Sequence, residues 1–157
     1  MASGERDRIS VELSDLSYSQ VRDLDKNAAD GKALEYYEAA QINGASVYRN
    51  KISGRVGNYF EEFVVELTVH GNEISSSCTC SQSREICRHA VALLYAWVND
   101  GGDFMNIGRV LDEIEKMDKI RLVEIISNII RVNPRFADVF LAKHNPEWDE
   151  IDMDLNV

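Results

Sequence analysis

The spacing of apolar and polar residues changes several times along the chain, and each change predicts a different element. In residues 1–30, apolar side chains recur at helical spacing and predict one short helix. Ser17 and Gln20 match the Ser-x-x-Gln pattern of a helix N-terminus, and Gly31 ends the run. The chain is therefore expected to begin with a helical segment before the pattern changes.

From Leu34 to Cys80 the pattern is typical of β-strands. Runs rich in Val, Ile, Tyr and Phe are separated by Asn-Gly or Gly-Asn pairs, which favour the positive φ angles of tight hairpin turns. Four strands are predicted, over residues 34–41, 45–56, 60–70 and 73–80. They are expected to form an antiparallel meander.

A polar loop follows the last predicted strand and leads to a helix from about Arg88 to Asn99. Leu93, Leu94 and Trp97 belong to a broad apolar surface on this helix, so it is expected to pack against the sheet. A linker is predicted at residues 100–103, where two glycines stand between two aspartates.

The chain beyond this linker is predicted to be helical. Helices are expected over residues 107–117, 119–132 and 135–143, with Asp118 and Asn133 as N-caps of the last two. Their apolar stripe comprises Leu122, Ile125, Ile126, Ile129, Ile130, Phe136, Val139 and Phe140. The stripe is interpreted as the core of a helical hairpin, and the alternative is a surface for a partner or a second copy.

Together these elements predict an α+β fold: a small antiparallel meander, a helix packed on it and a C-terminal helical unit. The predicted parts are an N-terminal segment with a short helix (1–30), a sheet-and-helix module (31–99), a helical unit (104–145) and an acidic tail (146–157).

Charge is distributed unevenly along the chain, whose net charge is −10. The segment from residue 44 to 99 is neutral, because its five acidic residues balance Arg49, Lys51, Arg55, Arg84 and Arg88. The excess acid lies in the flanks and repels phosphate, which makes the chain a poor autonomous binder of nucleic acid. No apolar run reaches the roughly 18 residues of a membrane span, and the charged N-terminus does not resemble a signal peptide, so a cytoplasmic location is expected.

All three cysteines lie within ten residues of one another. An odd number without a signal peptide argues against a disulfide framework. Cys78, Cys80, Cys87 and His89 instead form a C-x-C…C-x-H arrangement, which supplies the four thiolate and imidazole ligands that zinc prefers. The alternatives are buried free cysteines beside a core histidine, or a catalytic zinc, although four protein ligands would close the site to water.

The spacing also places the ligands on their elements. Cys78 and Cys80 are two residues apart at a strand end, so they point to the same side. Cys87 and His89 cannot both lie inside a regular helix, because a two-residue step turns the side chain by about 200°. Cys87 is therefore expected at the N-cap, with His89 in the first turn, where the helix dipole favours thiolate.

At these residues the chain resembles the SWIM zinc fingers, whose signature is C-x-C, a variable gap and C-x-H between a β-hairpin and a helix. The sequence SSSCTC…CRHAVALLYAW matches that signature, and the resemblance extends over residues 31–99. It implies one structural zinc and either DNA binding or contact with another protein, not catalysis. Helicase-like ATPases, transposases and ubiquitin ligases carry such fingers. This chain looks like a small prokaryotic stand-alone or accessory member.

Two functional hypotheses follow. The first is an accessory module that binds another protein, such as a DNA-processing enzyme, with self-association through the C-terminal helices as an open alternative. The second is direct DNA binding through Arg49, Lys51, Arg55, Arg84 and Arg88. Tyr36, Tyr37, Tyr48, Tyr59 and Phe60 are interpreted as core residues, and base stacking is their alternative. An enzyme is not expected, because no HExxH, P-loop, GxGxxG or GxSxG pattern occurs.

Overall fold

The computed structural model describes residues 8–39, 41–80 and 86–141. The chain divides into two compact units, Met1–Glu113 and Ile114–Val157, and each is described by itself. Among the described residues, no helix is both long and apolar enough to cross a membrane.

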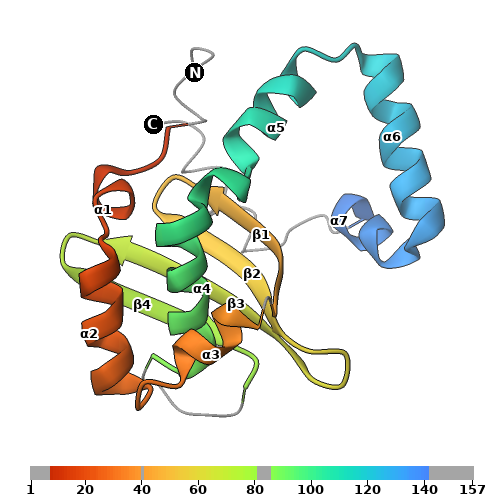
Figure 1. The fold of residues 1–157 in the computed structure, drawn as a ribbon. Coiled ribbons are helices and arrows are strands. Elements are labelled where there is room, and N and C mark those ends of the chain that lie inside the picture. The colour runs from red at the N-terminus through yellow and green to blue at the C-terminus, as the bar shows by residue number, and fades with distance from the viewer. Residues whose placement is uncertain (1–7, 40, 81–85, 142–157) are drawn as a thin grey trace. The chain divides into compact units, whose positions relative to one another are not determined.

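The first unit is built on a five-stranded sheet with the order β4-β3-β2-β1-β5 (Figure 1). The strands are β1 (Ile42–Tyr48), β2 (Lys51–Gly57), β3 (Glu62–His70), β4 (Glu73–Cys78) and β5 (Met105–Asn106). The first four pair antiparallel in chain order, whereas β5 pairs parallel with β1. The prediction of an α+β fold with a four-stranded meander is confirmed.

Two strand predictions are wrong: one segment is a helix, and the other contains two strands. Residues 34–41 were predicted as a strand, but Ala33–Glu38 is helix α3. Ala33 and Tyr37 are four residues apart, so both turn toward α4 (Arg88–Asp100), and this packing overrides the β-propensity of the two tyrosines.

The predicted strand over residues 45–56 is in fact two strands that turn at Arg49 and Asn50. Arg49, with φ 56°, adopts the left-handed conformation of this turn, which a glycine would adopt more easily. The sequence therefore contains no glycine that would have predicted the turn. The Asn43-Gly44 pair expected to form a turn lies inside β1, where the register shifts between Asn43 and Ser46. Gly44, with φ 59°, supplies the backbone freedom that this irregularity needs.

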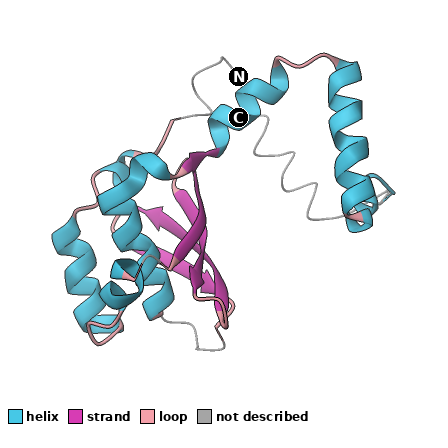
Figure 2. Cartoon of the chain, turned by 45° about the vertical axis from the view of Figure 1, so that its right-hand side comes forward, coloured by secondary structure: helices cyan, strands magenta, loops and turns pink. Residues whose placement is uncertain are grey.

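Helix α4 lies at the centre of the first unit. Nine consecutive residues, from His89 to Trp97, are buried, which means that no side of this stretch faces solvent. The sheet packs on α4, and so do α2 (Tyr18–Ala28) and α3, all on one face of the sheet (Figure 2). The sequence predicted contact with the sheet but not the helical cover.

Two buried hydrogen bonds join the N-terminal helices to α4. Trp97 Nε1 donates to the carbonyl oxygen of Leu13, in α1 (Val11–Ser14), at 2.8 Å. The Tyr95 hydroxyl donates to Asp25 Oδ2 at 2.9 Å, and the backbone N–H of Ala33 donates to Asp25 Oδ1 at 3.1 Å. Burial and the bond to Asp25 together raise the pKa of Tyr95. The first helices are thus part of the core of the first unit.

The residues expected to form a linker instead continue the first unit. Gly101–Asp103 is a 3₁₀ turn, and Phe104 is buried with its ring centroid 5.2 Å from that of Trp97. This contact positions β5 beside β1 before α5 (Ile107–Glu115) begins. The division between the units falls after Glu113, within the helix predicted over residues 107–117.

The second unit contains α6 (Lys119–Val132), a 3₁₀ turn (Pro134–Ala137) and α7 (Asp138–Leu141). The predicted caps are present: Asp118 accepts from the N–H of Arg121 at 2.9 Å, and Asn133 accepts from that of Arg135 at 3.3 Å. No residue of α6 is buried, so the described residues do not form the expected hairpin core. The predicted end of the last helix and the acidic tail lie outside the described residues.

Replacing Tyr95 with phenylalanine is expected to lower the free energy of unfolding by about 1–3 kcal/mol. The change leaves one oxygen of the buried Asp25 carboxylate without its donor. Tyr37→Phe is the matched control, because its hydroxyl donates to Asp100 at the surface and its loss should cost less. Urea unfolding of the zinc-loaded protein measures both, and equal losses would contradict the role given to Asp25.

Candidate metal centre

Four side chains converge where β4 ends and α4 begins. The ligand atoms of Cys78, Cys80, Cys87 and His89 all lie within 4.8 Å of one another. His89 Nδ1 is 3.8 Å from Cys78 Sγ and 3.9 Å from Cys87 Sγ. A tetrahedral zinc with ordinary bond lengths separates a sulfur and a nitrogen ligand by about 3.6 Å. The cluster therefore has the size and the donors that zinc requires.

The local structure explains why these side chains meet. Cys78 is the last residue of β4, and its sulfur accepts from the N–H of Cys80 at 3.5 Å. Cys87 is the N-cap of α4, with extended backbone angles of φ −87° and ψ 167°, and His89 follows in the first turn. The N-cap position and first turn predicted from the spacing are confirmed. The helix N-terminus directs its dipole toward the sulfurs, which favours thiolate.

Two aromatic rings hold the imidazole of His89 in place. Phe63, near the start of β3, stacks on it with ring centroids 4.2 Å apart and planes 27° apart. Tyr36 of α3 meets it edge-on at 5.1 Å. The ring is buried, and its Nδ1 is the nitrogen that faces the sulfurs of Cys78 and Cys87, whereas its Nε2 has no hydrogen-bond partner among the described residues. Sequence patterns did not single out Phe63, because its register beside Cys78 depends on the hairpin between β3 and β4.

Burial affects the protonation of the ligands. It raises the pKa of the Cys78 thiol to about 12. Burial, together with the neighbouring Arg88 guanidinium, lowers the pKa of His89 from its usual value. The imidazole is thus already in its neutral, liganding form, whereas the Cys78 thiol must release its proton, which a divalent cation promotes.

A family comparison matches residues 63–97 to the SWIM zinc finger. Residues 63–97 of this chain are a SWIM zinc finger. Comparisons with curated proteins and with solved structures gave no match. The SWIM finger covers β3, β4 and most of α4, which is less of the chain than the predicted residues 31–99, and its cluster holds one structural zinc ion.

The four described basic residues that were proposed as contacts do not all lie at the metal end of the finger. Arg49 lies in the turn between β1 and β2, with its guanidinium 5.2 Å above the ring centre of Tyr48. Lys51 pairs with Thr68 of β3, three residues along that strand from Val65, the register partner of Cys78. Both therefore lie toward the opposite end of the sheet from the cysteines.

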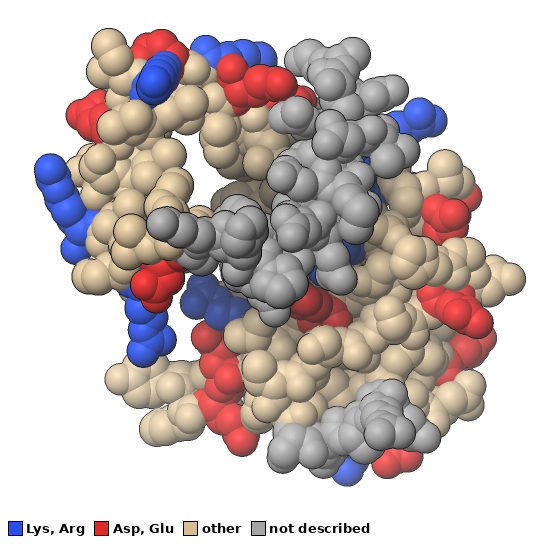
Figure 3. Space-filling model, turned by 180° about the vertical axis from the view of Figure 1, so that it is seen from behind, with Lys and Arg blue, Asp and Glu red and all other residues tan. Residues whose placement is uncertain are grey.

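The other three have different surroundings. Arg55 is nearer the metal end, at 3.8 Å from Glu62, and Lys51 is likewise 3.8 Å from Glu66. Arg88 is half-buried, with its guanidinium 5.9 Å from the ring centre of Tyr36, and Arg84 lies outside the described residues. Seen from behind, acidic and basic side chains are interspersed (Figure 3). Their role as contacts stays a prediction.

The interpretation of Tyr59 and Phe60 as core residues is wrong. They are 97% and 92% exposed, at the tip of the hairpin between β2 and β3. The signal was available, because the Gly57-Asn58 turn immediately precedes them. Tyr36 and Tyr37, in contrast, do pack against the core.

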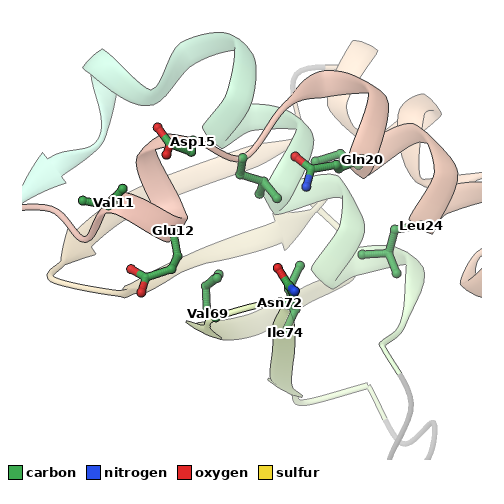
Figure 4. Close-up of a pocket in the computed structure, with 11 residues that line it drawn as sticks. Val11, Glu12, Asp15, Gln20, Leu24, Val69, Asn72 and Ile74 are labelled. Atoms are coloured by element: carbon green, nitrogen blue, oxygen red, sulfur yellow. The ribbon is translucent and has the colours of Figure 1, made fainter.

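The described residues also contain a groove between α1–α2 and the turn joining β3 to β4 (Figure 4). Leu16, Val21, Leu24, Val69 and Ile74 give it an apolar lining, to which Glu12 and Asp15 add carboxylates. The β3–β4 turn is at the opposite end of these strands from Cys78. The groove is therefore separate from the metal centre.

Protein purified without chelator is expected to contain one zinc per chain, and Cys87→Ser or His89→Ala should reduce this to less than half. His70→Ala is the control, because His70 is exposed at the far end of β3. Elemental analysis gives the stoichiometry, and X-ray absorption should show three sulfurs at about 2.3 Å and one nitrogen at about 2.0 Å. A substantial content of oxygen ligands would contradict the assigned set.

Chelation is expected to loosen the metal end of the sheet first, because the energy of metal binding at such sites is energy of folding. The N–H of Thr79, bonded to the Val64 carbonyl at 3.0 Å, and that of Val91, bonded to Cys87 at 3.1 Å, should exchange at least tenfold faster. Ile52, in the core of β2, should change less. Hydrogen exchange followed by NMR would refute this if all three amides responded equally.

Proposed function

We propose that this protein is an accessory interaction module that docks on another protein, such as a DNA-processing enzyme, through the hairpin tip beside its SWIM finger. The observation that carries the proposal is the pair of almost fully exposed aromatic rings at that tip, Tyr59 and Phe60. Large aromatic side chains dominate the energetics of protein interfaces, whereas exposing two of them in water brings no stability to a lone chain.

The tip is built to hold these rings in one arrangement. Asn58 Oδ1 accepts hydrogen bonds from the N–H of Phe60 at 2.9 Å and from that of Glu61 at 3.1 Å. Gly57 has φ 148°, and a Cβ there would overlap the Glu61 carbonyl oxygen, so only glycine fits. The two rings contact each other edge to face, with centroids 5.5 Å apart. A preorganised tip loses little entropy on binding.

The zinc supports this tip through a short path. Phe63, which stacks on His89, is in β3, three residues beyond Phe60 of the preceding hairpin tip. Val64 donates to Thr79 Oγ1 at 2.9 Å, which joins the start of β3 to the segment between the first two cysteines. The metal therefore has a positioning role in the proposal and no catalytic one, since four protein ligands leave no coordination position for a substrate.

Charge favours a protein over DNA as the partner. Glu61 adjoins the rings, and Arg55, the nearest basic residue of β2, is already close to Glu62. Phosphate would be repelled at the tip, whereas an apolar pocket with basic residues on its rim would be complementary to it. The thiols of Cys78, Cys80 and Cys87 require a reducing compartment to remain metal ligands, which supports a cytoplasmic location.

Direct DNA binding is the second candidate, supported by the family match and by Arg88, which adjoins the metal ligand His89. It predicts that affinity for a labelled 20-mer falls steeply between 50 and 200 mM salt, because each neutralised phosphate releases counterions. Arg88→Ala and Arg84→Ala should each weaken it further. We expect no measurable binding even at the lower salt, and salt-sensitive binding that these variants weaken would overturn the preference for a protein partner.

Capture from extract of the source cell tests the tip itself. Wild-type protein and the Asn72→Ser control, altered in the other hairpin turn, should recover the same partner. The double variant Tyr59→Ser/Phe60→Ser should lose at least tenfold in affinity for that partner once purified, since paired aromatic anchors each contribute about 2 kcal/mol or more. A partner that binds the double variant as well as wild type would refute docking through the tip.

A further inference from the structure

We propose that the outer edge of β4 and the groove beside it bind an extended, basic peptide segment of a partner protein. The β3–β4 turn at this groove is at the opposite end of β3 from the Tyr59–Phe60 tip, so the two surfaces are separate. Val69 and Ile74 of the sheet line one side of the groove, and α1 and α2 line the other (Figure 4). The peptide adds a strand to the sheet and directs alternate side chains into the groove.

Strand β4 is the last strand of the sheet, so no described strand pairs with its outer side. Backbone groups of successive residues in a strand point to opposite sides. The N–H of Thr79 bonds to the Val64 carbonyl of β3, and the register between the two strands is unbroken from there to the turn. The N–H and C=O of Ile74 and Ser76 are therefore directed to the open edge, where an added strand can bind them.

This edge lacks the features by which proteins normally prevent such pairing. Exposed edge strands typically contain lysine, proline or a bulge. Residues 74–77 are one isoleucine and three serines, and they pair with β3 without a bulge. The opposite edge of the sheet, β5, has only two residues and offers little backbone to a partner. β4, with six residues, is therefore the edge that can accept a strand.

The groove beside β4 is apolar and already formed. Val21 and Val69 are buried, and Ile74 packs against the core. The groove has a volume of about 570 Å³, within the range of about 300–1,000 Å³ that is usual for ligand sites. Buried hydrogen bonds from Trp97 and Tyr95 fix α1 and α2 on α4. The walls therefore need little reorganisation to accept apolar side chains.

Charge selects a basic segment as the occupant. Glu12 of α1 and Asp15, directly after that helix, line the groove, and no basic residue lines it. Neither carboxylate forms an ion pair with a described residue. Glu73 is exposed at the start of β4, on the face opposite to Ile74. The net charge of −10 also attracts cations. A segment that alternates apolar and basic residues is thus complementary to the site.

The test uses a capped hexapeptide of alternating lysine and valine, which matches the six residues of β4. It should bind the full zinc-loaded chain at least tenfold more tightly than the same peptide with glutamate for lysine, because like charges repel. By NMR, bound peptide should slow hydrogen exchange at the amides of Ile74 and Ser76 at least tenfold. The amides of Ser75 and Ser77 already face β3 and should change less.

Ser76→Pro removes one outward N–H and no bond to β3, which is where an edge strand accepts proline. It should weaken binding of the lysine peptide at least tenfold, whereas Ser76→Ala, which keeps the N–H, should not. Zinc content checks that the finger stays intact.

A second pair of variants tests the charges in case Ser76→Pro disturbs the fold. Glu12→Lys/Asp15→Lys should weaken binding at least tenfold. Glu35→Lys/Glu38→Lys makes the same charge change on α3, outside the groove, and should have less effect. Tyr59→Ser/Phe60→Ser should bind the peptide as wild type does, which separates this site from docking through the tip.

Four results would overturn the proposal. The first is the absence of binding at about 1 mM peptide. The second is equal affinity for the lysine and glutamate peptides, and the third is binding that leaves exchange at Ile74 and Ser76 unchanged. The fourth is slow exchange at these two amides in the free chain, since a second copy or residues 1–7 or 142–157 would then occupy the edge.

Discussion

Helix α4 has no solvent-exposed side between His89 and Trp97, and the arrangement of the first unit depends on this burial. A helix that is apolar all round must be enclosed on every face. The sheet covers part of it, and α2 and α3 cover another part (Figure 2). The buried polar groups along α4 then need partners, which Asp25 provides for Tyr95 and the Leu13 carbonyl for Trp97. Each bond fixes an N-terminal element relative to α4.

The metal fixes the other end of the same helix. Cys87 and His89 are on α4, whereas Cys78 and Cys80 are at the end of β4, so one ion sets the position of the helix start relative to the sheet. Apolar packing alone specifies such a position loosely, because it is non-directional. Bonds of defined length and angle specify it closely. The stack of Phe63 on His89 then transmits this position to β3 and its hairpin.

The predictions that depend only on local chemistry are confirmed by the structure. The capping box at Ser17 and the caps at Asp118 and Asn133 are present, and α6 spans the predicted residues 119–132. The placement of Cys87 at an N-cap followed from helix geometry alone. In each case a short segment carries the whole physical reason, so no knowledge of distant residues is needed.

Predictions failed mainly where contacts between residues far apart in the sequence determine the local structure. Tyr36 and Tyr37 have β-propensity, but packing against α4, more than fifty residues away, makes their segment helical. The turn at Arg49 lacks glycine and is stabilised from β3, since Asn50 Nδ2 donates to the Val69 carbonyl at 3.1 Å. Tyr59 and Phe60 are an exception, because the Gly57-Asn58 pair that directly precedes them was a local signal for a turn, and they are exposed at the hairpin tip.

Tyr59 and Phe60 form a small contact, which by itself buries less area than a standard interface. In the proposed docking, affinity would therefore depend on how well the tip is preorganised rather than on its area. The edge-to-face packing of the two rings and the hydrogen bonds from Phe60 and Glu61 to Asn58 limit the conformational entropy lost on binding. The stack of Phe63 on His89 joins the base of the same hairpin to the metal ligands, so loss of zinc would weaken docking without removing either ring.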